Sequence, residues 1–163
     1  MPNIESSIVE VCVFKLVERK PMYLVLRRSP QVSLFPGIWQ IITGRIEAGE
    51  HAVHAAEREV REETGLAAER FWSLPFINSF YEPVHDIVHL CPHFAVQVVG
   101  DAEVRLSEEH EEFEWCQFER AQTLLLWTGQ RTGVRIVETQ IVQGTEESRL
   151  LEIPPDHPER KQQ

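Results

Sequence analysis

Residues Gly44 to Leu66, with the sequence GRIEAGEHAVHAAEREVREETGL, carry the strongest structural signal in the chain. From His51 to Thr64 there is no Gly or Pro, and Ala, Glu and Arg, which favour helices, are abundant. Gly65 follows directly, and glycine ends helices readily because it adopts the left-handed backbone conformation without strain. The stretch therefore predicts a loop followed by a helix over residues 51–64.

The predicted helix carries three glutamates at the border of its apolar face. Its core-facing arc on a helical wheel comprises Val53, Ala56 and Val60. Glu59, Glu62 and Glu63 stand at positions i, i+3 and i+4, and Glu63 falls at the edge of the apolar arc. Two carboxylates about 5.5 Å apart repel by about 3 kcal/mol at an effective dielectric of about 20, and burial also removes hydration. A nearby cation would relieve both effects.

A hard divalent cation is one explanation for this acidic patch. Mg²⁺ and Mn²⁺ prefer oxygen ligands, keep several waters and are commonly completed by a phosphate group. Zn²⁺ is disfavoured because no Cys or His pair with suitable spacing lies nearby. The alternative is a solvated helix face stabilised by i,i+4 pairs such as Arg58 with Glu62, and the residues alone leave both explanations open.

Length and charge restrict the remaining possibilities. The 163 residues, 42% of them hydrophobic, suit one domain, which we expect over residues 1–152, followed by a flexible proline-containing tail over 153–163. A formal net charge of -10 disfavours general binding to nucleic acid. No apolar run reaches the roughly 18 residues of a membrane span, and the N-terminus lacks a basic signal start, so we expect a cytoplasmic protein without a membrane partner.

Strand-like runs surround the central helix. They cover residues 8–16, 23–28, 38–42, 71–78, 87–99 and 113–116, with further helices expected over 118–126 and 132–142. In the run over 87–99 we expect Pro92 to interrupt the strand. His85, His89 and His93 could share one face of this run, but without an acidic motif around them a structural or surface role is preferred.

The motif resembles the Nudix hydrolase signature at every specified position. It consists of Gly, five residues, Glu, seven residues and Arg-Glu-apolar-x-Glu-Glu-x-Gly-apolar, and its nine specified positions here are Gly44, Glu50, Arg58, Glu59, Val60, Glu62, Glu63, Gly65 and Leu66. The resemblance extends over about residues 5–145. It implies an α/β/α sandwich with a mixed, partly antiparallel sheet, in which the signature forms a loop-helix-loop that holds divalent cations.

Carried over position by position, the resemblance assigns roles within the motif. It implies Glu59, Glu62 and Glu63 as ligands of Mg²⁺ or Mn²⁺, with the carbonyl of Gly44 as a further ligand. Arg58 would orient the carboxylates through an ion pair, and we expect Glu50 as its partner.

The activity implied by the resemblance is hydrolysis of a nucleoside diphosphate linked to another group, by attack of water at a phosphorus. Arg27, Arg28 and Arg45 are candidate phosphate partners. Because Arg27 and Arg28 are consecutive on a strand, at most one of them should face the site. For each, a solvated surface position is the alternative.

Two shorter matches resemble one branch of the family, the dihydroneopterin triphosphate and dATP pyrophosphohydrolases. The first is Trp39-Gln40-x-x-Thr-Gly44, and it makes Trp39 and Gln40 candidate substrate contacts. The second is Glu109-His-x-x-aromatic-x-Trp115, in which Glu109 is the candidate for a further metal ligand or the general base. A (deoxy)nucleoside triphosphate, cleaved to monophosphate and pyrophosphate, is therefore the first-choice substrate.

Three alternatives compete with triphosphate hydrolysis. Hydrolysis of ADP-ribose, of dinucleoside polyphosphates or of a related conjugate is the second choice within the enzyme class. A non-catalytic nucleotide-binding module usually carries a damaged signature, whereas this one is intact. Isomerase chemistry would require additional catalytic Cys and Glu positions that we cannot place. Homodimers are common in the family, so a second copy of the chain is a candidate partner.

Overall fold

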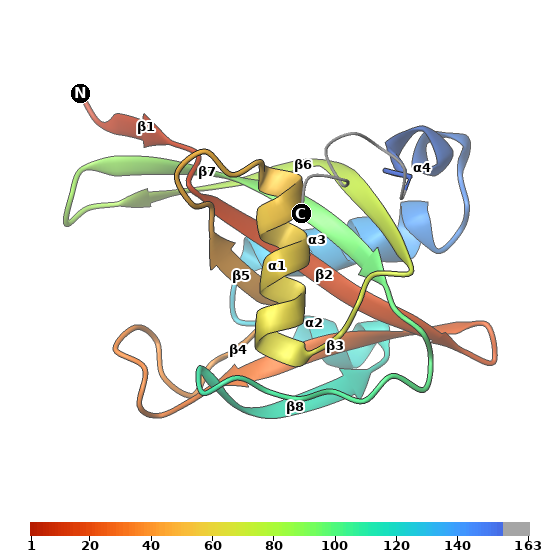
Figure 1. Cartoon of the computed structure of the whole chain (residues 1–163). Coiled ribbons are helices and arrows are strands. Elements are labelled where there is room, and N and C mark those ends of the chain that lie inside the picture. The colour runs from red at the N-terminus through yellow and green to blue at the C-terminus, as the bar shows by residue number, and fades with distance from the viewer. Residues whose placement is uncertain (155–163) are drawn as a thin grey trace.

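A mixed sheet of eight strands organises residues 1–154, the part of the chain that the computed structural model describes (Figure 1). The strands are β1 (Asn3–Glu5), β2 (Ile8–Val17), β3 (Lys20–Arg28), β4 (Trp39–Gln40), β5 (Ile42–Arg45), β6 (Arg70–Glu82), β7 (Ile87–Gln97) and β8 (His110–Cys116). The helices are α1 (Ala52–Thr64), α2 (Phe118–Leu124), α3 (Thr128–Ile136) and α4 (Glu146–Leu151), and a π-helical segment, η1 (Val137–Ile141), continues α3.

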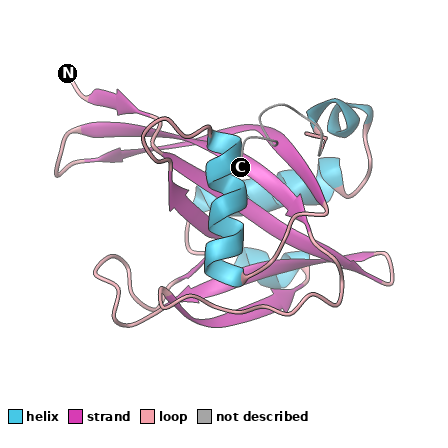
Figure 2. Ribbon diagram, in the orientation of Figure 1, coloured by secondary structure: helices cyan, strands magenta, loops and turns pink. Residues whose placement is uncertain are grey.

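Parallel and antiparallel pairs are combined in this sheet. Strand β7 runs parallel to β1 and β2 and antiparallel to β6. Strand β3 is antiparallel to β2, β4 and β8, and β5 is antiparallel to the first half of β2. Helix α1 covers one face of the sheet, and α2 and α3 cover the other (Figure 2). The predicted α/β/α sandwich with a mixed, partly antiparallel sheet is confirmed.

Strand β2 is apolar along most of its length because both of its faces are covered. Val11 and Val13 belong to the core cluster that includes Val60 of α1. Cys12 and Phe14 point to the opposite side and pack in the cluster beneath α2 and α3. The first cluster holds α1 against the sheet, and the Glu59 carboxylate in its second half lies against Gly44 of β5.

Pro92 does not interrupt its strand, contrary to the sequence prediction. Strand β7 runs unbroken from Ile87 to Gln97, and Pro92 pairs with Ile77 of β6. The pairing register of β6 and β7 shifts between Ser73 and Ile77, next to this proline. A proline lacks an N–H to donate, and such an irregularity is where a strand accommodates it.

Two other predicted elements differ from the structure. The run expected over 38–42 forms two short strands, because the chain switches at Ile41 from pairing with β3 to pairing with β2. The helix expected over 132–142 begins earlier, at Thr128, and ends in the π-helical segment η1. By contrast, α1 ends at Thr64, and Gly65 adopts the predicted left-handed conformation with φ of 70°.

The C-terminal end of the described chain is attached to the sheet. Ile153, the first residue of the expected tail, donates its backbone N–H to the carbonyl of Phe71 at 2.8 Å and packs against the core. The rest of the expected tail, from residue 155 onward, lies outside the described residues. Within residues 1–154, no helix is long and apolar enough to cross a membrane.

Candidate active site

The second half of α1 carries the predicted acidic cluster. Glu62 is exposed and Glu59 is half-buried, whereas Glu63 is only 4% exposed. Oε2 of Glu63 has no hydrogen-bond partner among the described residues. Burial, followed by the charges of Glu59 and Glu109, raises the pKa of Glu63 well above its usual value. Within residues 1–154, the site therefore holds a buried carboxylate that lacks a positively charged neighbour in direct contact.

Gly44 of β5 lies directly against Glu59. A Cβ atom at position 44 would stand 2.0 Å from Cδ of Glu59 and 2.3 Å from its Oε1. Only glycine permits this approach, because any side chain would displace the carboxylate. The backbone of β5 and the carboxylate of Glu59 thus lie close together, as the proposed ligand roles of both residues require.

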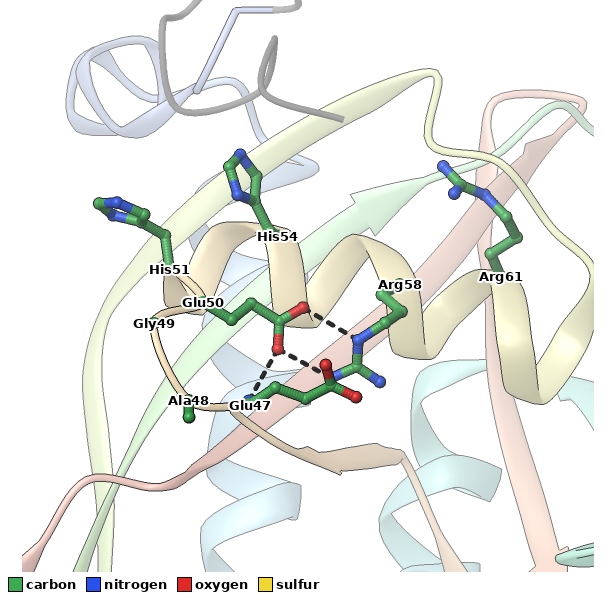
Figure 3. A pocket seen from close by; sticks show the side chains of 8 residues that line it. All are labelled: Glu47, Ala48, Gly49, Glu50, His51, His54, Arg58 and Arg61. Atoms are coloured by element: carbon green, nitrogen blue, oxygen red, sulfur yellow. Dashed lines mark hydrogen bonds and ion pairs between the residues drawn. The ribbon is translucent and has the colours of Figure 1, made fainter.

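Arg58 joins the loop before α1 to the carboxylates of the helix. It donates from Nε and Nη2 to the two carboxylate oxygens of Glu50, each at 2.9 Å. From Nη1 it also donates to Glu59 at 2.7 Å and to Glu62 at 3.1 Å. The backbone N–H of Glu47 donates to Glu50 as well, at 2.9 Å. Figure 3 shows Glu50 between Arg58 and the N–H of Glu47. These residues line one wall of a pocket of about 500 Å³ that extends along α1 past His54 to Arg61.

These contacts influence the pKa values of the carboxyl groups around Arg58. The guanidinium beside Glu50 lowers the pKa of that carboxyl. The pKa of Glu59 is raised instead, since its burial outweighs the pairing with Arg58. Arg58 is thus shared among several carboxylates and leaves their negative charge only partly compensated.

The loop before β8 brings Glu109 to the cluster. The backbone carbonyl of Glu109 accepts from the N–H of Ser29 at 2.8 Å, which ties the loop to the end of β3. The N–H of Ser107 donates to the backbone carbonyl of Glu63 at 3.1 Å. The charge of Glu109 contributes to the raised pKa of both Glu59 and Glu63, so the structure places it close to the residues with which it was grouped.

His110 is a site residue that the sequence interpretation missed. It is 4% exposed, its Nδ1 lies 3.8 Å from Oε2 of Glu63, and its Nε2 lies 3.3 Å from Nε2 of Gln40. Burial, together with the positive charge of Arg28, lowers the pKa of His110 to about 4, so its ring is neutral at pH 7. The available signal was its place in the second short motif, directly after Glu109.

The candidate phosphate-binding arginines are separated in the structure. Arg28 is near enough to the cluster for its charge to act on Glu63 and His110. Arg27 instead pairs with Glu112 at 3.2 Å and with Glu111 at 3.4 Å. Arg45 is exposed and contributes its backbone carbonyl to Arg58 at 2.8 Å. Of the two consecutive arginines, Arg28 is the one beside the acidic cluster.

The candidate base-contacting residues lie nearby in β4. Trp39 is half-buried and packs against the core cluster beneath α2 and α3. Gln40 is buried and directed at His110. A separate aromatic pair, Phe35 with Trp127, is in edge-to-face contact with 5.1 Å between ring centroids. Phe35 and Trp127 lie 92 positions apart in the chain.

The three histidines of the β6–β7 region have structural partners. His85 and His89 both pair with Glu82. His93 is buried beneath α3, with its Nδ1 3.1 Å from Oε2 of Glu10. Burial tends to raise the pKa of Glu10, but His93 and the amides of Asn78 and Gln130 outweigh it and lower the pKa. The preference for a structural role agrees with these contacts.

A divalent cation fits the acidic cluster chemically. As they stand, the described residues contain no group of three Asp, Glu, His or Cys side chains close enough to enclose an ion. Mg²⁺, however, is commonly held by only one or two carboxylates together with waters and substrate phosphates. The unpartnered oxygen of Glu63 and the close approach of Glu59 to the backbone of Gly44 provide such oxygen donors.

Comparison with known proteins identifies the family of this arrangement. Residues 7–136 match the family model of the NUDIX domain. The chain belongs to the Nudix family. Members of this family hydrolyse pyrophosphate bonds, and the match includes all the motif residues described above.

Curated relatives with several different names resemble this Nudix chain. An octanoyltransferase of Myxococcus xanthus is 36% identical over 134 residues, which are 78% of this chain and 35% of that protein. The m7GpppN-mRNA hydrolase NUDT17 of Xenopus laevis is 29% identical over 85% of this chain and 47% of its own length. The nucleoside triphosphatase NudI of Escherichia fergusonii is 24% identical over 64% of this chain and 79% of its own. The chain thus spans about a third and about half of the first two relatives.

Solved structures share the Nudix fold. A NUDIX hydrolase of Listeria monocytogenes, described as putative, is 25% identical with a TM-score of 0.71, covering 85% of this chain and 96% of that one. The dihydroneopterin triphosphate pyrophosphohydrolase of E. coli is 20% identical with a TM-score of 0.65, covering 86% and 99%. At this identity the second likeness shows the fold alone.

Proposed function

We propose that this chain is a Mg²⁺-dependent pyrophosphohydrolase of small nucleotides. The first-choice substrate is a (deoxy)nucleoside triphosphate, which would be cleaved to a monophosphate and pyrophosphate. The observation that carries the proposal is the cluster of Glu59, Glu62, Glu63 and Glu109, in which a buried carboxylate oxygen lacks a partner and Gly44 permits close approach. Such a cluster is costly in a folded protein unless a cation completes it, and the bound cation can then attract a polyanionic substrate.

The site residues have different proposed roles in this reaction. Glu59, Glu62, Glu63 and the carbonyl of Gly44 would hold a cation that neutralises non-bridging phosphate oxygens and makes a bound water more acidic. Arg58 fixes the direction of the Glu59 carboxylate through its contact at 2.7 Å. Arg28 supplies positive charge for the phosphates.

The proposed reaction is a displacement at phosphorus. A water molecule transfers a proton to the carboxylate of Glu109 as its oxygen bonds to a phosphorus of the substrate. The bond from that phosphorus to the bridging oxygen breaks, and the bridging oxygen leaves with the other phosphate group. Glu109 is exposed on a loop, where it can exchange the proton with solvent.

The names of the relatives favour a nucleotide substrate, and the choice of a triphosphate among nucleotides is our proposal. NudI is named a nucleoside triphosphatase, and the Trp39-Gln40-x-x-Thr-Gly44 segment resembles the triphosphate branch. Hydrolysis of ADP-ribose or dinucleoside polyphosphates is the alternative activity, and a non-catalytic nucleotide-binding module is the alternative class. Cytoplasmic location and a homodimer are also proposed, and light scattering of the purified chain tests the homodimer.

A substrate panel tests the proposal most directly. The dNTPs, dihydroneopterin triphosphate, ADP-ribose and diadenosine tetraphosphate are each incubated with Mg²⁺, and the phosphate products are resolved. Release of pyrophosphate from a triphosphate is expected, and EDTA should abolish it until Mg²⁺ is restored. Turnover of ADP-ribose or diadenosine tetraphosphate without turnover of any triphosphate would contradict the proposed substrate. Turnover of none of the compounds would favour a non-catalytic binding module.

Matched variants test the acidic cluster. Glu62→Gln and Glu63→Gln are expected to lower kcat by at least about 10²-fold with the fold retained. Glu103→Gln makes the same chemical change at an exposed glutamate and should leave kcat unchanged. Unchanged turnover in both cluster variants would remove the metal-site assignment.

A further inference from the structure

Three buried side chains from separate elements lie next to one another, and the last of them belongs to the acidic cluster. Gln40 comes from β4, His110 from the start of β8 and Glu63 from α1. Each of the three is 4% exposed. Gln40 Nε2 lies 3.3 Å from His110 Nε2, and His110 Nδ1 lies 3.8 Å from Glu63 Oε2. The imidazole therefore stands between an amide and a carboxylate.

The amide decides which nitrogen of the imidazole carries the proton. Nε2 of Gln40 can only donate a hydrogen bond, so the facing nitrogen of His110 must accept one. In a neutral ring the proton is then on Nδ1, the nitrogen that faces Glu63. Neither Nδ1 of His110 nor Oε2 of Glu63 has a hydrogen-bond partner within the described residues. A buried donor, Nδ1–H of His110, thus faces a buried acceptor, Oε2 of Glu63, and neither has another partner among the described residues.

The backbone holds Gln40 and His110 in place. Gln40 pairs with Leu26 of β3, and His110 pairs with Arg28 of the same strand. Directly after Gln40, the N–H of Ile41 donates at 3.2 Å to the buried side chain of Gln130 from α3. Gln40 and His110 are therefore attached to one strand, and their contact does not depend on a mobile loop.

We propose that His110 is a positioning residue for Glu63. Its proton location is set by Gln40, and it donates from Nδ1 to Oε2 of Glu63, which fixes the orientation of the carboxylate. The separation of 3.8 Å exceeds hydrogen-bonding distance by about 0.6 Å or more, so the proposed hydrogen bond requires the two side chains to approach each other by that amount. The inference rests on the proposed function, in which Glu63 is a metal ligand, and partners of metal ligands commonly tune metal affinity by 10- to 100-fold.

The proton location is tested first, on the intact protein without metal. Long-range ¹H–¹⁵N NMR distinguishes the two neutral imidazole tautomers, and the His110 signals are assigned by their loss in a His110→Asn variant. A proton on Nδ1 is expected, with a shift toward the other tautomer in Gln40→Leu. A proton on Nε2 in the wild-type ring would overturn the proposal, because Nδ1 would then have nothing to donate.

Metal binding is tested next, by calorimetry or by electron paramagnetic resonance of Mn²⁺ without nucleotide. His110→Leu keeps the approximate volume but removes the donor, and Mn²⁺ affinity should fall by about 10- to 100-fold. His110→Asn places an amide N–H near the position of Nδ1 and should retain affinity within about threefold of wild type. Equal affinity in the leucine variant and in wild type would refute the role of His110.

A comparison variant separates this proposal from the proposed function. If Glu63→Gln lowers Mn²⁺ affinity while His110→Leu does not, the metal site stands and only the positioning role fails. If Glu63→Gln itself leaves Mn²⁺ affinity unchanged, the proposed metal site fails. A far-ultraviolet circular dichroism spectrum of each variant confirms that it is folded before its affinity is compared.

Discussion

Replacing Gly44 with alanine should separate activity from stability. The added Cβ would lie 2.0 Å from Cδ and 2.1 Å from Cγ of Glu59. Carbon atoms in contact are normally about 3.5–4.0 Å apart, so the Glu59 side chain must retreat by about 1.5 Å. The atoms in the way belong to the end of a flexible side chain, and the backbone of β5 can therefore keep its place.

The retreat is expected to lower kcat strongly while the chain stays folded. A displacement of about 1 Å at a reacting centre lowers rates by about 10²-fold, and we expect a fall in kcat of that order. The contact of Arg58 with Glu59 at 2.7 Å is lost, which costs about 1.5–3 kcal/mol. Lower chain entropy in the unfolded state returns about 0.4–1 kcal/mol. The net loss of about 0.5–2.6 kcal/mol corresponds to a melting temperature lower by a few degrees in a chain of this size.

Steady-state kinetics and thermal unfolding of the same preparation measure the two effects. Gly100→Ala is the control, because its Cβ would meet only the carbonyl of Leu16, at 3.4 Å. The double variant Gly44→Ala with Glu59→Ala lacks the clashing atoms and should unfold no more readily than Glu59→Ala alone. Wild-type kcat in folded Gly44→Ala would show that the position of Glu59 against β5 has no part in the reaction.

Further predictions concern Arg58, Glu10 and Glu109. Arg58→Lys should lower kcat by about 10- to 100-fold, because an ammonium group cannot hold both oxygens of Glu50 while contacting Glu59. The measurement is kcat at saturating substrate, and a wild-type value would contradict this prediction. The pKa of Glu10 is lower in the folded protein than in the unfolded chain. As pH drops below the ordinary value of 4.5, Glu10 is therefore protonated in the unfolded chain before it is protonated in the folded protein, and the free energy of unfolding falls. Urea unfolding at a series of pH values should show a shallower acid dependence for Glu10→Gln than for wild type, and an equal slope would exclude this carboxyl as its source. Glu109→Gln should lower kcat less than Glu63→Gln does, or change the metal dependence, and wild-type kinetics at all Mg²⁺ concentrations would move the role of base to a neighbouring glutamate.

Much of the fold and part of the site follow from local sequence patterns. The helix over 51–64 was predictable because helix formers and a terminating glycine act within a few residues of one another. The placement of Glu63 toward the core followed from helical periodicity, and it is 4% exposed in the structure. The ion pair of Arg58 with Glu50 spans only eight positions and was expected from the resemblance to the family signature.

Other features depend on contacts between distant segments. Gln40 meets His110 across 70 positions, so this contact cannot be read from a local pattern. The place of His110 directly after Glu109 marks it as a candidate, but only packing sets its imidazole beside Glu63. The tolerance of Pro92 within β7 depends on a register shift against the neighbouring strand β6.

The sequence by itself therefore determined the family, the central helix and the acidic residues along it, since each of these rests on spacing within one continuous segment. Only the tertiary structure decided which buried side chains face those acids. Burial and pairing of polar groups are properties of the packed sheet and helices, in which residues from β4, β8 and α1 become neighbours.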